Sequence, residues 1–300
     1  MTGVDPLAGR TAFISGASRG IGLEIARMLA RGGANIALIA KTDTPNPKLP
    51  GTIHEAAEEL RGLGADVLPV VGDIRDEERV AAVVAHTVDR FGAIDICINN
   101  ASALNLADVA SMPVKRFDLL QSVNVRGTFV VTQTCLPHLR RAEHAHILTL
   151  SPPLNLDPNW FAPAAYTVSK YGMTIVTLGV ARTEREHGVA ANCLWPLTAI
   201  ATAAVKNLLG GESTVTHSRT PRIVADAAGI VLRRDPAVYT GNAAIVEDVL
   251  AEQGITDLAP YSVESGQTRF VPDFFVDPQL VDPHIPAALD LDDIAARPPR

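Results

Sequence analysis

A glycine-rich turn near the N-terminus constrains the fold of this chain more than any other feature. The segment Ser15-Gly-Ala-Ser-Arg-Gly-Ile-Gly22 follows an apolar run at residues 11–14 and opens a helical pattern over residues 20–31. A helix N-terminus offers unpaired N–H groups and a positive dipole end, and glycine lets a phosphate approach the backbone. The turn therefore predicts a strand, a tight turn and a helix that hold a dinucleotide, with a plain strand-to-helix turn as the alternative.

The rest of the chain alternates between strand-like and helix-like segments. Apolar runs typical of buried strands occupy residues 11–15, 35–40, 67–71, 94–99, 146–150, 189–194 and 243–246. Helical periodicity is found near residues 20–31, 52–63, 77–91, 115–140, 165–187 and 222–233. This alternation predicts an α/β fold, a Rossmann-type doubly wound parallel sheet of about seven strands in a single domain.

Two segments interrupt the alternation. Residues 42–51 contain three prolines and are expected to form a loop beside the adenosine end of a bound nucleotide. We place the domain at residues 1–254 and a C-terminal extension at residues 255–300. The aromatic residues of the extension are expected to dock on the domain, and its last twenty or so residues are expected to be loose.

Composition excludes several functional classes. Hydrophobic residues make up 47% of the chain, which is enough for a sizeable core, and the net charge of −7 argues against nucleic acid as a partner. Cys97, Cys135 and Cys193 are odd in number and lie in apolar patterns, so we expect buried thiols in a reducing compartment, without a disulfide or a metal site. Neither a signal peptide nor a membrane span is recognisable, and we expect a soluble, cytoplasmic protein.

Tyr166 and Lys170 are the strongest candidates for chemistry. They are four residues apart in a helical segment and therefore share one face of the helix. An ammonium beside a phenol stabilises the phenolate, which would make the tyrosine a usable acid or base near neutral pH. An exposed pair without a function is the alternative for such a spacing taken alone.

The charge at the end of the second strand bears on the choice of cofactor. Folds that bind NAD usually place Asp or Glu about 20 residues beyond the glycines, where it binds the ribose 2′-hydroxyl. This chain has Lys41 there, and Arg19 lies within the glycine-rich turn. Both cations would attract a 2′-phosphate, which favours NADP. Ordinary solvated cations are the alternative.

These motifs resemble the short-chain dehydrogenase/reductase family over about residues 8–250. The resemblance implies that Tyr166 donates or accepts the proton and that Lys170 lowers the tyrosine pKa and holds the nicotinamide ribose. It also implies that Asn124 binds a water that links Lys170 to solvent. The loop after the sixth strand is expected to contribute to cofactor binding, and Thr202 is a further candidate there. The expected cofactor-binding residues are Gly16, Ser18, Arg19, Gly20, Ile21, Gly22, Lys41, Asp73, Ile74, Asn100, Ala101, Tyr166, Lys170, Pro196, Thr198 and Ile200.

One residue of the family pattern is missing. The family usually has a serine thirteen positions before the tyrosine, where it polarises the substrate carbonyl, and that position here is Pro153. Ser151, Asn155 and Trp160 are the nearby side-chain donors, and Tyr166 acting alone is the remaining alternative. We favour Ser151 as the fourth catalytic residue, because it keeps the residue type at the end of a strand.

The proline-rich run after Ser151 and the segment Pro272-Asp-Phe-Phe275 resemble, more narrowly, the hydroxysteroid dehydrogenase-like protein 2 branch of the family, without the sterol-carrier domain of its longer members. We therefore expect an NADP-dependent oxidoreductase that interconverts a carbonyl and an alcohol on an apolar small-molecule substrate of lipid-like, acyl or steroid-like type. We also expect a homodimer or homotetramer formed through residues 115–140 and 165–187. Residues 203–211 are expected to close over the substrate. A cofactor-binding scaffold with little turnover and an enoyl-type reductase are the alternatives.

Overall fold

Seven parallel strands form one sheet in the order β3-β2-β1-β4-β5-β6-β7. The computed structural model describes residues 5–46, 49–282 and 284. All six strand pairs are parallel, which confirms the predicted doubly wound sheet. The strands are β1 (Thr11–Ser15), β2 (Asn35–Ala40), β3 (Val67–Val71), β4 (Ile96–Asn99), β5 (Ala145–Thr149), β6 (Val189–Trp195) and β7 (Ala243–Ile245).

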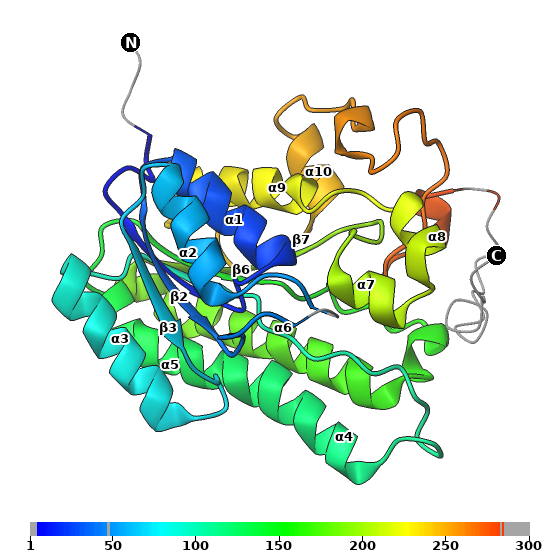
Figure 1. The fold of residues 1–300 in the computed structure, drawn as a ribbon, viewed down its shortest axis with the longest axis horizontal. Coiled ribbons are helices and arrows are strands. Elements are labelled where there is room, and N and C mark those ends of the chain that lie inside the picture. Colours follow the sequence, from blue (N-terminus) through cyan, green and yellow to red (C-terminus); the bar gives the residue numbers. More distant parts are fainter. Residues whose placement is uncertain (1–4, 47–48, 283, 285–300) are drawn as a thin grey trace.

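Helices cover both faces of the sheet (Figure 1), and each layer has its own apolar core. One layer consists of α1 (Gly20–Arg31), α2 (Ile53–Gly62), α9 (Arg222–Arg233) and α10 (Val246–Ala251). The other consists of α3 (Glu77–Phe91), α4 (Val114–Leu120), the π-helix η1 (Gln121–Arg126), α5 (Gly127–Leu139) and α6 (Ala164–Glu184). Because the sheet is buried on both sides, its strands are apolar on both sides, as their sequences predicted.

The predicted helix over residues 115–140 is divided into three parts. Its central turn, η1, is a π-helix that contains Asn124, whose side chain hydrogen-bonds both backbone groups of Ala103. Helical periodicity does not reveal the one extra residue that a π-turn holds, and such turns are frequent at functional sites.

Short elements gather at the carboxyl ends of the strands. They are η2 (Pro158–Phe161), α7 (Ala203–Leu208), α8 (Gly211–Thr216), η4 (Ala259–Tyr261) and η5 (Pro278–Leu280), while η3 (Arg185–His187) follows α6. The strand order reverses between β1 and β4, and ligands of such sheets bind at the carboxyl edge beside that reversal. The expectation of a loose chain end concerns about the last twenty residues, and all of these except Val281, Asp282 and His284 lie outside the described residues.

None of the helices within residues 5–46 and 49–282 is long and apolar enough to cross a membrane. Cys97, Cys135 and Cys193 are all buried and unpaired, in agreement with the sequence-based expectation of buried thiols.

Candidate active site

The glycine-rich turn is shaped by backbone that only glycine adopts readily. Gly16 and Gly20 have φ angles of +72° and +59°. A Cβ on Gly16 would lie 2.8 Å from the Cα of Ala101, so the turn approaches the strand β4 loop too closely for a side chain. Helix α1 begins at Gly20, and its N-cap residue Arg19 makes no side-chain capping bond. The first N–H groups of α1 are therefore left for an anion.

Asn100 fixes the position of this turn. Its Nδ2 donates to the carbonyls of Ser15, at 3.1 Å, and Gly16, at 2.9 Å. The backbone N–H groups of Asn100 and Ala101 both donate to the Ser15 hydroxyl at 3.2 Å. The turn after β1 and the loop after β4 thus form one rigid unit, which explains why the asparagine is needed there.

Two cations pair with one carboxylate at the ends of β2 and β3, and a third cation lies in the glycine-rich turn. Lys41 Nζ lies 3.7 Å from Asp73, and Arg75 donates to both oxygens of that carboxylate. Burial raises the pKa of Asp73, but Arg75 and Lys41 outweigh it and the net pKa is lowered. Arg19 donates to the carbonyls of Pro50 and Gly51, at 3.0 and 2.6 Å, in the proline-rich loop. Arg75 was missed in the sequence analysis, although it stands two residues after Asp73.

Ile74 fills the space between β3 and the second helical layer. It is buried, and a Cβ on Gly127 would lie 2.9 Å from its Cγ1. Glycine at the start of α5 therefore lets the loop after β3 pack closely against η1.

Tyr166 and Lys170 lie near the start of α6, both buried. Lys170 Nζ donates to the Leu150 carbonyl at 2.6 Å and lies 4.8 Å from the centre of the Trp195 ring. Burial lowers the pKa of Lys170 to about 7, against the opposing effect of Asp273. Burial, together with Asp273, raises the pKa of Tyr166, so this environment does not give the lowered tyrosine pKa expected from the sequence.

Asn124 braces the helix that carries this pair. Its Oδ1 accepts the Ala103 N–H at 2.7 Å, and its Nδ2 donates to Ala103 O at 3.0 Å and to Ser169 Oγ at 2.9 Å. Ser169 in turn donates to the Tyr166 carbonyl at 2.7 Å. Asn124 thus connects the loop after β4 to the turn of α6 between Tyr166 and Lys170.

The candidates for the missing serine differ in their surroundings. Ser151 is fully buried, and its hydroxyl has no hydrogen-bond partner among the described residues. Asn155 donates from Nδ2 to the Phe275 carbonyl at 3.1 Å. Trp160 is buried in an aromatic cluster with Phe274 and Phe275. Ser151 is thus a buried hydroxyl beside the Cys193 thiol, whereas the Asn155 amide is already bonded to the backbone of the extension.

The loop after β6 is held by residues distant in sequence. Leu197 N–H donates to Glu247 at 2.9 Å, Ala199 N–H donates to Val271 O at 2.8 Å, and Asp273 N–H donates to Leu197 O at 2.9 Å. The Thr198 hydroxyl within this loop is buried without a partner among the described residues. The remaining candidates of the loop are Pro196 and Ile200, both buried, and Thr202, which caps α7 and lies 3.4 Å from the position of a Cβ on Gly20.

The C-terminal extension covers Tyr166. Phe274 and Phe275 are buried, and their ring centroids lie 6.0 and 5.8 Å from that of Tyr166. The Phe274 carbonyl accepts from Trp195 Nε1 at 2.8 Å. Asp273, Glu247 and the two phenylalanines were not among the site residues predicted from the sequence, because no local pattern marks them.

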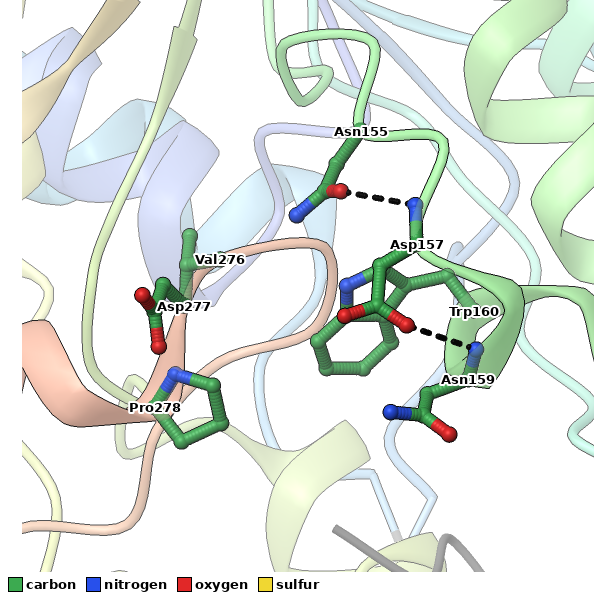
Figure 2. A pocket seen from close by; sticks show the side chains of 7 residues that line it. All are labelled: Asn155, Asp157, Asn159, Trp160, Val276, Asp277 and Pro278. Atoms are coloured by element: carbon green, nitrogen blue, oxygen red, sulfur yellow. Dashed lines mark hydrogen bonds between the residues drawn. The ribbon is translucent and has the colours of Figure 1, made fainter. Parts of the chain in front are cut away.

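A cavity of about 220 Å³ lies where the extension meets the loop after β5. Figure 2 shows Asn155, Asp157, Asn159 and Trp160 along one side and the extension along the other. The carboxylate of Asp157 accepts the Asn159 N–H, and Asn155 accepts the Asp157 N–H, so this loop is held by its own polar side chains. Trp160 lines the cavity and also belongs to the apolar cluster that contains Tyr166.

Comparisons with known proteins agree with this geometry. Residues 10–212 match the family model for short chain dehydrogenases. The chain is 48% identical over 272 residues to hydroxysteroid dehydrogenase-like protein 2 of Xenopus tropicalis, which covers 90% of this chain and 64% of that protein. The chain thus spans less than two thirds of the length of that relative.

Two solved structures are also similar over nearly their whole length. A short chain dehydrogenase from Mycobacterium thermoresistibile is 53% identical, with a TM-score of 0.86 over 91% of this chain and 97% of that one. A putative dehydrogenase from Xanthomonas campestris is 51% identical, with a TM-score of 0.86 over 90% and 98%. The chain therefore belongs to the short-chain dehydrogenase/reductase family, in the branch that contains the hydroxysteroid dehydrogenase-like protein 2 sequences.

Proposed function

We propose that this protein is an NADP-dependent oxidoreductase that interconverts a carbonyl and an alcohol on a largely apolar substrate. One observation carries the proposal. Tyr166 and Lys170 stand on one helix at the carboxyl edge of the sheet, the same edge at which the uncapped N-terminus of α1 meets the glycine-rich turn.

The residues at this edge fit a dinucleotide. The glycine-rich turn leaves backbone N–H groups for the pyrophosphate. The unpartnered Thr198 hydroxyl suits the carboxamide of a nicotinamide, and Lys170 suits the neighbouring ribose. When bound, the cofactor would supply the hydride chemistry. Tyr166 would pass the proton to or from the substrate oxygen, and Ser151 would donate a hydrogen bond to that oxygen.

The choice of NADP is supported by charge. Lys41 and Arg19 supply positive charge where the adenosine ribose would lie, and Arg75 pairs with the carboxylate of Asp73 there. An acidic residue at the end of β2, which would accept from a ribose 2′-hydroxyl, is replaced by Lys41. A 2′-phosphate would therefore gain charge-assisted hydrogen bonds that a bare hydroxyl cannot accept.

The apolar substrate is supported by the surroundings of Tyr166. Trp160, Phe274, Phe275 and Trp195 form a cluster around the phenol. A flat or hydrocarbon-like molecule would bury more area against these rings than a polar one.

A binding protein with little turnover is the second candidate. It is favoured by the covering of Tyr166 by Phe275, by the raised pKa of Tyr166, and by Pro153 at the usual serine position. A scaffold would need the cofactor cradle but not the proton donor.

Steady-state assays with NADPH and a panel of ketones, 3-oxoacyl thioesters and enoyl thioesters distinguish these functions. We expect ketone or 3-oxoacyl reduction that is lost in Tyr166→Phe, with cofactor affinity retained. Tyr171→Phe is the matched control, because it removes a hydroxyl from the same helix that bonds the Asn155 backbone. Turnover of enoyl substrates alone would identify the enoyl-type reductase, and cofactor binding without turnover would identify the scaffold.

Assembly and location are part of the same proposal. Phe129 on α5 and Val168 and Ile175 on α6 are about half exposed or more, and apolar helical faces of this kind support a homodimer or homotetramer. Three buried free cysteines support a reducing, cytoplasmic location.

A further inference from the structure

Asp273 lies between the loop after β6 and the residues that carry the chemistry. Its N–H donates to the Leu197 carbonyl at 2.9 Å, and the carbonyl of the next residue, Phe274, accepts from Trp195 Nε1 at 2.8 Å. The same indole ring lies 4.8 Å from Lys170 Nζ. The extension therefore holds the backbone of Asp273 and Phe274 against Trp195, the residue whose ring lies beside Lys170.

Contacts of the next two residues, Phe274 and Phe275, also hold the Asp273 segment in place. Phe274 and Phe275 both pack on the Tyr166 ring, and Asn155 holds the Phe275 carbonyl. The Phe274 N–H donates to Asp273 Oδ1 at 2.7 Å, which orients the carboxyl group. Asp273 is thus fixed by backbone and side-chain bonds in a partly buried position.

We propose that Asp273 is a positioning residue of the active site, whose carboxylate sets the pH range over which Tyr166 and Lys170 hold and exchange protons. The proposal adds a third titratable group to the pair and rests on the proposed function. The group comes from the C-terminal extension, about a hundred residues away along the chain.

The charges that face Asp273 come from several elements. Lys170 and Tyr166 project from α6, Glu247 lies on α10, and Arg219 faces Glu247. Burial raises the pKa of Asp273 to about 7, Glu247 adds to the rise, and Phe274 N–H and Lys170 oppose it. Cys193 lies near Lys170 and has a pKa raised by burial.

The sign of the effect follows from Coulomb's law. A carboxylate stabilises the ammonium form of Lys170 and disfavours the phenolate form of Tyr166, so it raises the pKa of both. Removing the negative charge should therefore lower both pKa values. Asp273→Asn removes the charge and keeps an Oδ1 that can accept the Phe274 N–H, so the loop should stay in place.

The direct test is a pH titration of Lys170 by NMR in the cofactor-free protein labelled with ¹⁵N-lysine. The chain has five lysines, so the side-chain spectrum is simple, and Lys170→Arg assigns the signal. We expect Asp273→Asn to lower the midpoint of Lys170 by about one pH unit or more, and Asp273→Glu to restore much of it. An unchanged midpoint in Asp273→Asn overturns the proposal.

Asp257→Asn is the matched control, because Asp257 is an exposed aspartate of the same extension that accepts a backbone N–H from Ala259. We expect it to leave the Lys170 midpoint in place. An equal shift in this variant would also overturn the proposal, because the effect would then come from the net charge of the extension.

The second readout is the pH profile of kcat/KM. We expect both limbs of the profile to move to lower pH in Asp273→Asn, whereas a purely structural role would lower the whole profile without moving its limbs. Failure of the proposed function would leave no turnover in the wild type, while the NMR titration would still report on Asp273. Normal turnover with an unmoved Lys170 midpoint would refute only the role of Asp273.

Discussion

Phe275 stacks on Tyr166, with the two ring centroids 5.8 Å apart and the ring planes at 29°. Phe275 is the only residue other than glycine among the described residues with a positive φ, at +68°. That backbone conformation is unfavourable for a bulky side chain, and the Asn155 bond to the Phe275 carbonyl helps to hold it. The backbone of the extension is therefore strained at Phe275, the residue that covers Tyr166, the proposed proton donor.

Phe275→Ala should destabilise the protein and uncover Tyr166. Truncation of a fully buried phenylalanine costs about 3–5 kcal/mol of unfolding free energy. Urea unfolding measures this loss. Phe161→Ala, at a nearby ring that is 46% exposed, is the control and should cost about 1 kcal/mol or less. Similar costs for both variants would show that the extension does not pack on Tyr166 in solution.

Lys41→Ala should weaken NADPH binding and leave NADH binding nearly unchanged. A charge-assisted contact to a 2′-phosphate contributes about 1.5–3 kcal/mol, which corresponds to roughly ten- to a hundred-fold in the dissociation constant. Isothermal titration calorimetry with both cofactors measures the difference. Lys115→Ala, on the exposed start of α4, should change neither affinity. Equal binding of NADH and NADPH by the wild type would refute the assignment of NADP.

Ser151→Ala should lower kcat/KM by about 10²–10³, because it removes a preorganised donor to a developing oxyanion. Asn155→Ala should cost much less, since that amide is already bonded to the Phe275 carbonyl. Kinetics on the best substrate of the panel measure both. A large loss in Asn155→Ala alone would reassign the donor, and no loss in either would leave Tyr166 to polarise the carbonyl by itself.

The protein should lose stability as the pH falls from about 6.5 to about 4. Burial, followed by the nearby His144, lowers the pKa of His146 to about 4, against about 6.5 in an unfolded chain. The unfolded state therefore binds more protons in this range. The resulting stability of about 3 kcal/mol is fully present above pH 6.5 and is lost by pH 4.

Urea unfolding at pH 7 and pH 5 tests this dependence. His146→Gln keeps a donor for the Arg234 carbonyl and should flatten the change in unfolding free energy between the two pH values. His86→Gln, on the exposed side of α3, should leave the change as it is in the wild type. An undiminished loss of stability in His146→Gln would assign the pH dependence to other groups.

Features that depend on local spacing along the chain could be predicted from the amino-acid sequence. Apolar runs predicted the seven strands, and helical periodicity predicted helices between them. Each pattern could be recognised because it follows from the backbone geometry of a single element. Gly16 and Gly20 marked the turn through a conformation that few other residues adopt, and the four-residue spacing of Tyr166 and Lys170 placed both on one face of α6.

The distant groups that surround Tyr166 and Lys170 come together through the packing of separate elements. Asp273 and Phe275 reach Tyr166 because Val271 and Asp273 bond to the loop after β6, a pairing that no local pattern signals. The pKa of Tyr166 also depends on burial and on Asp273, not on the spacing to Lys170 alone. Spacing along the chain fixes the geometry within one element, whereas burial and electrostatic environment arise only when separate elements pack together.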